Sequence, residues 1–411
     1  MRDDPMRDNT FPTQLTFDEA RSIVDTIAAA NRLPTERLAI ARTHQRILAQ
    51  DVIAPMPLPP FDNSAMDGYA VRHADVAAGE TTLRLVGEQF AGRALGLRVG
   101  EGECVRITTG APMPEGADTV VIREVVRVDG ENIAIPAGIR AHANVRRAGE
   151  DVRTGDAILA PGQVLTPARV ATTASLGIDQ LTVSARPTVA VFTTGDELVP
   201  PGMPLDPGQI HDSNRELLMG LLRADGLEPT AWPTLPDDPV RIESMLRDAA
   251  SSFDVVITCG AVSAGEKDHV PALLAEHGRV HFWKVRMKPG MPLLFGELDR
   301  ARFLGLPGNP VSVFATYATL GRRLLDGLQG RTEPRRQFRA RLAAAIDKPH
   351  ARREFMRGTL EAGEDGTLRV TPDAATGSHR LRAAAMADVL IVVPDGPQSL
   401  AVGDVVDVLP Y

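Results

Sequence analysis

The chain has 411 residues, more than the roughly 250 to 300 at which one hydrophobic core stops growing, so several domains are expected. Its 43% hydrophobic residues include no apolar stretch near the roughly 18 residues that a membrane helix needs. A net charge of −8 and 4% aromatic residues disfavour nucleic-acid binding, which needs clustered Lys and Arg. The first ten residues lack the apolar run of a secretory signal, so we expect a cytoplasmic protein.

The cysteine content limits the metal and redox chemistry. Cys104 and Cys259 are the two cysteines of the chain, which excludes a disulfide framework and an all-cysteine metal site. We expect both to be buried, reduced thiols.

The first half of the chain predicts helix, then β structure, then helix again. Thr16 with Glu19 three residues later is a capping-box pattern and begins a predicted helix over 16–30. Short β-branched runs alternate with Gly and Pro turns from about 71 to 158, and Thr-Pro begins a second helical pattern over 166–178. The predicted units are a discontinuous linker domain, 14–58 plus 148–184, and a β-rich domain, 59–147, inserted into it.

The second half predicts an α/β domain and then another β domain. Apolar runs suited to strands buried on both faces lie at 188–192, 254–259 and 301–306. Helical patterns fall between and after them, at 214–225, 239–250, 270–278 and 310–325. This alternation implies an α/β domain with a parallel sheet over 185–330. Short strands after Thr332 predict a barrel-like β domain over 333–411.

Three loops begin where the predicted parallel strands end. They are TTGDEL (193–198), CGAVSAGEKD (259–268) and LPGNPVS (306–312). Ligands bind beyond the carboxyl ends of such strands, where Gly-rich backbone offers N–H groups to anions. A structural turn would explain any one loop, but three at equivalent strand ends favour a site for a phosphate-bearing substrate. The expected binding residues are Gly195, Asp196, Gly260, Ser263, Gly265, Pro307, Gly308 and Asn309.

Carboxylates in the same loops predict a metal ion. Glu197 follows the first strand, and Asp268 lies in the second loop. Mg²⁺ bridging them to phosphate oxygens would explain acids beside an anion site. Exposed loop acids are the alternative, and Asp268 is the better candidate for a ligand or for activating a water.

Cations cluster in KVRMKPG (284–290). Lys284, Arg286 and Lys288 alternate, so on one strand they would point to the same side of the sheet. Lysines that protect an edge strand from aggregation are the alternative.

Two loop-like segments, PFDNSAMDGYAV (60–71) and RITTGAPMPEGAD (106–118), mix small polar residues with carboxylates. Asp62, Asp67, Thr108 and Thr109 are candidates for holding a ligand, with turn capping as the competing interpretation of the aspartates. A nucleophile elbow, a Cys-His pair and HExxH are all missing from the sequence, which leaves anion positioning plus a metal as the predicted mechanism.

Seven segments together resemble the molybdopterin molybdenumtransferase family of the MoeA type. The resemblance follows nearly the whole chain in order, through PFDNSAMDGYAV, RITTGAPMPEGAD, VFTTGDEL, GQIHDSNR, SAGEKDHV, FWKVRMKPG and LGLPGNPVS. It implies an elongated homodimer with the site between protomers, in which the linker domain takes part in dimerisation. Contacts with a molybdopterin adenylyltransferase and with molybdoenzymes are a further implication.

The resemblance also implies a reaction. Adenylylated molybdopterin would be cleaved with Mg²⁺, AMP would leave, and molybdate would enter the dithiolene to form molybdenum cofactor. The soft sulfur ligands belong to the substrate, so the enzyme needs no cysteine cluster. Molybdate and phosphate are hard oxyanions that suit N–H donors, Lys and Arg.

Functional residues follow from the resemblance position by position. It implies catalytic roles for Asp62, Thr109, Asp268, Lys284 and Lys288, a metal at Asp268 and Glu197, and substrate contacts at Arg357 and Ser378.

The chain departs from the family pattern at four positions. Met291 replaces a lysine, Ala261 a glycine, Ala383 a serine and Asp388 an asparagine. A tungstate-preferring paralogue, a non-catalytic scaffold and a metal-dependent hydrolase or nucleotidyltransferase are therefore alternatives. The retained Asp268, Lys284 and Lys288 favour an active enzyme.

Overall fold

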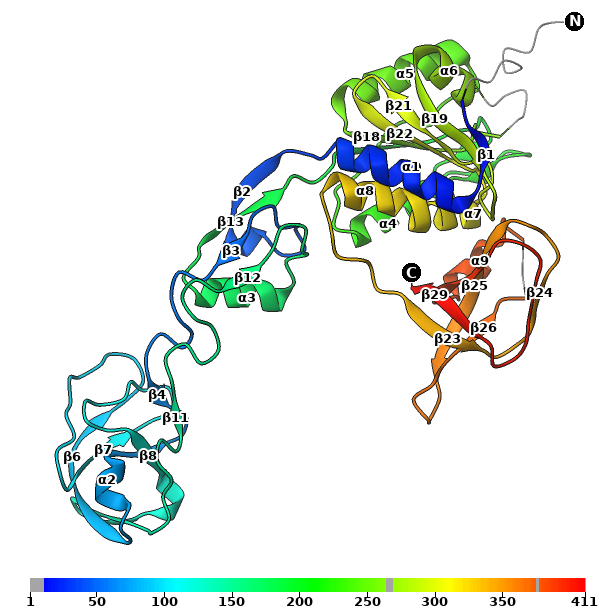
Figure 1. Cartoon of the computed structure of the whole chain (residues 1–411). Helices are drawn as coiled ribbons and strands as arrows, with labels where there is room; N and C mark the ends of the chain where they lie inside the picture. Colours follow the sequence, from blue (N-terminus) through cyan, green and yellow to red (C-terminus); the bar gives the residue numbers. More distant parts are fainter. Residues whose placement is uncertain (1–10, 264–268, 375–376, 411) are drawn as a thin grey trace, which may run out of the picture.

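The computed structural model describes residues 11–263, 269–374 and 377–410, and shows an elongated molecule of four units (Figure 1). An α/β unit lies at one end and a distal β unit at the other, with a small linker unit between them. The C-terminal β unit lies beside the α/β unit. In the described residues, the helices are all too short or too polar to cross a bilayer.

A seven-stranded sheet forms the centre of the α/β unit. Its spatial order is β1-β19-β21-β22-β18-β14-β17, with bounds Thr13–Leu15, Gly278–Val285, Leu294–Leu298, Ala301–Leu306, Val255–Cys259, Val189–Thr193 and Thr230–Ala231. The three predicted apolar strands are β14, β18 and β22, which lie side by side and parallel, so this prediction is confirmed. Antiparallel β21, between β19 and β22, makes the complete sheet mixed.

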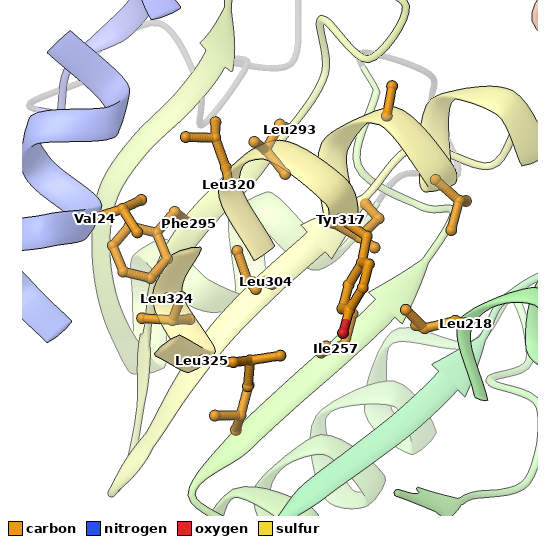
Figure 2. Close-up of a cluster of buried hydrophobic side chains, with 14 of the residues drawn as sticks. Val24, Leu218, Ile257, Leu293, Phe295, Leu304, Tyr317, Leu320, Leu324 and Leu325 are labelled. Carbon is orange, nitrogen blue, oxygen red and sulfur yellow. The ribbon is translucent and has the colours of Figure 1, made fainter. Parts of the chain in front are cut away.

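Helices cover both faces of this sheet, which explains why β14 and β18 are buried along their whole length. One face carries α1, α4, α7 and α8, with bounds Phe17–Ala30, Ser213–Ala224, Pro310–Thr316 and Arg322–Leu328, and a π-helical turn at Tyr317–Gly321 joins the last two. Figure 2 shows part of this core, where Val24, Leu218 and Leu324 surround the strand residues Ile257 and Leu304. The other face carries α5 (Pro239–Ser252) and α6 (Val270–His277).

The first helix belongs to the α/β core. Its predicted capping box is present, since the Thr16 and Glu19 side chains each bond the other's backbone N–H. Ala20 and Val24 are fully buried in the same cluster as the central strands, and β1 pairs with β19. The apolar stripe of α1 is thus buried against α8 and the sheet, although the predicted domain bounds assign these residues to the linker domain.

The chain passes through the linker unit twice, and the two passes together form it. It contains β2 (Thr35–Ala39), β3 (Val52–Ile53), β12 (Ala157–Leu159), α3 (Pro167–Ser175) and β13 (Gln180–Ser184), with a short helical turn at Ile40–Arg42. β2 pairs with β13, and β3 with β12, so segments over 100 residues apart share one small core.

The distal β unit is a six-stranded sheet. Its order is β8-β5-β7-β6-β10-β9, with bounds Thr119–Ile122, Gly68–Val71, Glu103–Ile107, Thr81–Gln89, Asn132–Ile135 and Arg127–Asp129. Short helices occupy His73–Val76 and Arg123–Val125, and β4 (Asn63–Ser64) pairs with β11 (Val145–Arg146) where the chain enters and leaves.

The C-terminal unit is a closed barrel, as predicted. Each of β23, β25, β26, β27 and β29 pairs with two others in a ring; their bounds are Phe338–Leu342, Arg353–Ala362, Leu368–Pro372, Val389–Val393 and Val405–Pro410. β24 (Ile346–Lys348) pairs with β28 (Gln398–Leu400), and α9 spans Leu381–Ala385. Strand β20 (Met287–Lys288), from the α/β half of the sequence, pairs in parallel with β25.

The two cysteines are free and buried, as predicted. Burial raises the pKa of the Cys104 thiol to about 12 and also raises the pKa of Cys259. Both thiols therefore stay protonated and unreactive near neutral pH.

Candidate functional site

The three predicted loops converge on one cleft of about 600 Å³. The loops follow β14, β18 and β22, whose parallel pairing brings their carboxyl ends to the same edge of the sheet. The cleft is lined by these predicted residues: Gly195, Glu197, Gly260, Ser263, Pro307, Gly308 and Asn309. Convergence of the loops, expected from their positions at strand ends, is confirmed.

The start of α4 adds a wall that the sequence interpretation did not nominate. Asp212 caps this helix by accepting the N–H of Arg215. The next residues, Ser213 and Asn214, line the cleft, and Asn214 Nδ2 donates to the Gly308 carbonyl at 2.6 Å. An Asp before a helical pattern was the available signal, since the segment GQIHDSNR entered the analysis only as part of the family resemblance.

A buried polar network fixes this wall to the sheet. The Thr193 hydroxyl donates to Asp212 Oδ2 at 2.6 Å, and Arg215 Nε donates to the same oxygen at 3.0 Å. Asp212 is only 3% exposed, so both of its partners are needed to compensate the buried charge. The start of α4 is thus held rigidly beside the end of β14.

The Asn214 side chain also presents an unused acceptor. Its Oδ1 is buried and has no hydrogen-bond partner among the described residues. Buried polar atoms are rarely left unpaired, so this oxygen is a candidate for accepting a ligand N–H.

Glu197 faces the cleft, and its neighbour Asp196 is used differently. A Cβ built on Gly195 would lie 2.2 Å from Glu197 Oε2, so the absence of a side chain makes room for this carboxylate. Asp196 Oδ1 instead accepts the N–H of Asp237 at 3.3 Å. Asp196 and Glu197 thus make different contacts, and substrate binding by Asp196 stays a prediction.

A second pocket of about 300 Å³ adjoins the cleft and shares Pro292 and Asn309 with it. Its walls come from both the α/β unit and the barrel. The predicted residues Lys288, Arg357 and Ser378 line it, together with Arg352.

Two of the cations in this second pocket have carboxylate partners. Lys288 Nζ lies 2.9 Å from Glu354 Oε1, and Arg357 Nε donates to Asp373 Oδ2 at 3.1 Å. Three cationic and two anionic side chains line the described pocket, which leaves a formal charge of +1. This environment suits a small oxyanion.

Placing Lys284, Arg286 and Lys288 on one side of a single strand was wrong. Lys284 has a φ of +67°, which interrupts the alternation near the end of β19. Its ammonium lies 3.9 Å from the centre of the Trp283 ring, and neither pocket, as formed by the described residues, includes it. Lys288 instead lies on β20, in the sheet of the barrel.

Asp62 and Thr109 lie in the distal β unit, well separated from the cleft of the same chain (Figure 1). Asp62 accepts the N–H of Ala148 at 2.8 Å and pairs with Arg147 at 2.6 Å. These partners, the Ala148 N–H foremost, lower the pKa of Asp62. Within one chain its contacts are those of a turn-capping residue.

Thr109 caps a neighbouring loop. Its N–H and hydroxyl both donate to Asp67 Oδ1, at 2.7 and 2.9 Å, and lower the pKa of that carboxyl. The turn-capping interpretation therefore describes Asp67 as well.

The metal prediction rests partly on Asp268, which, like Gly265, lies outside the described residues. The described residues contain no group of three His, Cys, Asp or Glu side chains placed to hold a metal. Mg²⁺ at phosphate sites commonly uses one or two carboxylates plus phosphate oxygens. Glu197 on the cleft wall fits that donor set, although it would not form an all-protein cage.

The chain is elongated and has a cleft at the strand ends of its α/β unit, beside a closed barrel. It is therefore a multidomain protein of the class that binds ligands at the carboxyl ends of parallel strands. Residues 15–177 match the MoeA N-terminal region (domain I and II), residues 190–327 a probable molybdopterin binding domain, and residues 339–411 the MoeA C-terminal region (domain IV).

Similar proteins agree with these matches. The chain is 38% identical to a molybdopterin molybdenumtransferase of Haemophilus influenzae over 97% of this chain and 98% of that one. It is 37% identical to molybdopterin molybdenumtransferase 2 of Mycobacterium tuberculosis over 87% and 90% of the two chains. A molybdopterin biosynthesis moeA protein of Pyrococcus horikoshii has a similar structure, with a TM-score of 0.82, 27% identity and coverage of 97% and 100%. The chain belongs to the MoeA family.

Proposed function

We propose that this chain cleaves adenylylated molybdopterin, releases AMP and transfers molybdenum from molybdate to the pterin dithiolene. The observation that carries the proposal is the cleft with a smaller cationic pocket beside it, Pro292 and Asn309 lining both. One cavity is large enough for part of a nucleotide-linked pterin, and the adjoining one is suited to an oxyanion. Family membership supports the same assignment.

The cleft would hold the pterin and its phosphates. The Gly-containing loops after β14, β18 and β22 offer backbone N–H groups to phosphate oxygens. The unpaired Oδ1 of Asn214 would accept an N–H of the pterin ring, which a phosphate cannot supply.

The smaller pocket would hold molybdate. Lys288 and Arg357 are held by carboxylates, so their N–H groups are oriented before the ligand arrives. Ser378 closes the pocket from the barrel side, where its carbonyl accepts the N–H of Val311. Met291, which is 40% exposed, also lines this pocket. It stands where the family pattern has a lysine, and its neutral thioether adds no charge to the pocket.

We infer that Mg²⁺ binds at Glu197 with Asp268. A bound Mg²⁺ would neutralise charge on the phosphate that is cleaved. Water attack on the phosphoanhydride breaks one P–O bond and gives AMP and the molybdopterin phosphate, and Asp268 would accept the proton of the water.

We infer further that the protein acts as a homodimer in which the partner's distal β unit reaches the cleft. Support comes from the position of Asp62 and Thr109, which the family resemblance makes functional and which lie far from the cleft of their own chain. An elongated protomer with its two candidate regions at opposite ends suits a two-fold dimer with composite sites.

The test is AMP release from adenylylated molybdopterin with and without Mg²⁺ and molybdate. Glu197→Gln and Asp268→Asn should each lower release about 100-fold, in the range of a lost acid-base or metal-binding group. Glu216→Gln is the matched control, because Glu216 is exposed on α4 and is not among the residues that line the cleft, and it should retain most activity. AMP release that needs neither Mg²⁺ nor molybdate would contradict the proposal. Repeating the assay with tungstate in place of molybdate measures which oxyanion the protein prefers.

A further inference from the structure

We propose that Glu354, on the C-terminal barrel, is a positioning residue that orients the Lys288 ammonium toward the oxyanion pocket. The inference rests on the proposed function, since Lys288 is there the cation that meets molybdate. It assigns the barrel a direct part in the reaction: the barrel supplies the carboxylate that holds a lysine of the α/β half.

Strand pairing across the two units creates the contact. Strand β20 joins the barrel sheet in parallel with β25, and its register places Lys288 directly opposite Glu354. Lys288 Nζ lies 2.9 Å from Glu354 Oε1. The lysine therefore takes its place only when the barrel is docked on the α/β unit.

Burial makes Glu354 a fixed partner. The Glu354 side chain is 9% exposed, whereas the Lys288 side chain is 34% exposed. A buried carboxylate without a partner is strongly destabilising, so Glu354 holds its cation more tightly than a surface acid would. The ion pair holds the ammonium, which carries three N–H donors, at the wall of the pocket.

His350 lies on the other side of the carboxylate. Its Nε2 is 3.0 Å from Glu354 Oε2 but is not aligned for a hydrogen bond, and neither ring nitrogen has such a partner among the described residues. Burial lowers the pKa of His350, and the charges of Lys288, Arg352 and Lys348 lower it further, against the raising effect of Glu354. The imidazole is therefore neutral near pH 7, which leaves Lys288 as the charged partner of Glu354.

A rigid turn carries this arrangement. Lys348 is 1% exposed, and its ammonium donates to the carbonyls of His350, Arg352 and Gly396. The N–H of Gly396 in turn donates to the carbonyl of Ala351. The turn that leads into β25 is thus tied at both ends, just before Glu354.

The opposite side of β25 docks on the first helix. Arg353 makes a two-bonded contact with Asp18, at 3.0 and 2.9 Å, and the rings of Phe17 and Phe355 lie 5.0 Å apart. Glu354 lies between Arg353 and Phe355 on this strand and lines the pocket. Helix docking therefore sets the position of the carboxylate that orients Lys288.

The experiment measures molybdate-dependent AMP release by the full chain in a double-mutant cycle of Glu354→Gln and Lys288→Met. Glu354→Gln should lower the rate about tenfold, since small misplacement of a catalytic group costs up to about 100-fold. In the Lys288→Met background the same change should cause no further loss, because its effect passes through the lysine. Glu354→Asp, one methylene shorter with the charge kept, should also lower the rate. Glu361→Gln, exposed on the same strand, is the control and should behave as the wild type.

Three outcomes would overturn the proposal. Equal losses with and without Lys288 would show a general structural role for Glu354. A loss in Glu354→Gln with full activity in Glu354→Asp would show that only charge matters. If the wild type releases no AMP, the proposed function fails. Calorimetric titration of the protein with sodium molybdate then tests the positioning role of Glu354. Weaker molybdate binding in both Glu354 variants supports that role, and unchanged or tighter binding overturns it.

Discussion

The cleft of the α/β unit and the tip of the distal β unit contain the same kinds of residue, carboxylates and threonines among glycines, but use them differently. In the cleft, Glu197 lines open space, and the buried Asn214 oxygen has no hydrogen-bond partner among the described residues. At the tip, Asp62 and Asp67 accept N–H groups of neighbouring loops, those of Ala148 and Thr109. The contrast shows that loop composition identifies polar segments, whereas the hydrogen-bond partners show which side chains are already engaged within their own chain.

The largest expected effect tests whether the tip and the cleft act together across a dimer. Thr109→Val and Glu197→Gln should each lower AMP release at least about tenfold as homodimers. The readout is AMP release after the two variants are co-expressed and purified through different tags. The mixed dimers selected in this way should recover about half of wild-type activity, because one of their two composite sites is intact.

The matched control for complementation mixes Glu197→Gln with Lys288→Met. Both changes lie in the same half of the proposed site, so the mixed dimer contains no intact site and should stay inactive. Recovery in this control, or none with Thr109→Val, would refute the trans arrangement.

The next effect concerns the cleft alone. Gly260 has a φ of +100°, and a Cβ at this position would lie 2.3 Å from Thr194 Oγ1. Gly202 has a similar φ of +93°, but a Cβ there would have no atom of the described residues within 4 Å. Gly202→Ala should cost about 1 kcal/mol of backbone strain, and Gly260→Ala about 3 kcal/mol because overpacking adds to it. Denaturant unfolding measures both. Equal costs would show that the loop yields freely, and AMP release should fall in the Gly260 variant alone.

A smaller effect should appear at the tip on acidification. The N–H of Ala148 and the Arg147 guanidinium lower the pKa of Asp62, so its stabilising contribution is present above the unfolded Asp pKa and is lost as pH falls through the folded value. Wild type should therefore be more stable than Asp62→Asn at pH 7, and the difference should shrink below about pH 4. Urea unfolding at both pH values measures it; a constant difference would contradict the assignment.

The smallest expected effect is at Ala261, where the family has glycine. Ala261 has a φ of +55°, a left-handed conformation that costs a non-glycine residue about 1 to 2 kcal/mol. Ala261→Gly should stabilise the chain by about 0.5 kcal/mol, since glycine's greater unfolded-state entropy offsets part of the relief. Thermal unfolding should show a raised midpoint. Ala401→Gly, in an exposed loop, should lower it instead, and the same sign at both positions would rule out relief of strain.

The sequence by itself determined the local elements and the place of the site. The capping box at Thr16 and the helix after Thr166 depend on residues three apart, and both are present. Continuous apolar runs indicated β14, β18 and β22 because strands buried on both faces need them. Loops at the ends of parallel strands then had to meet at one edge.

Only the tertiary structure decided which distant segments pair. Joining α1 to the α/β core, and β20 to the barrel beside Glu354, depends on contacts between residues about 65 to more than 200 positions apart, which no local pattern encodes. The left-handed turn at Lys284 likewise breaks an alternation that the sequence suggested. Backbone preferences act over a few residues, whereas the surface that an apolar stripe or a carboxylate finally meets is set by packing of the whole chain.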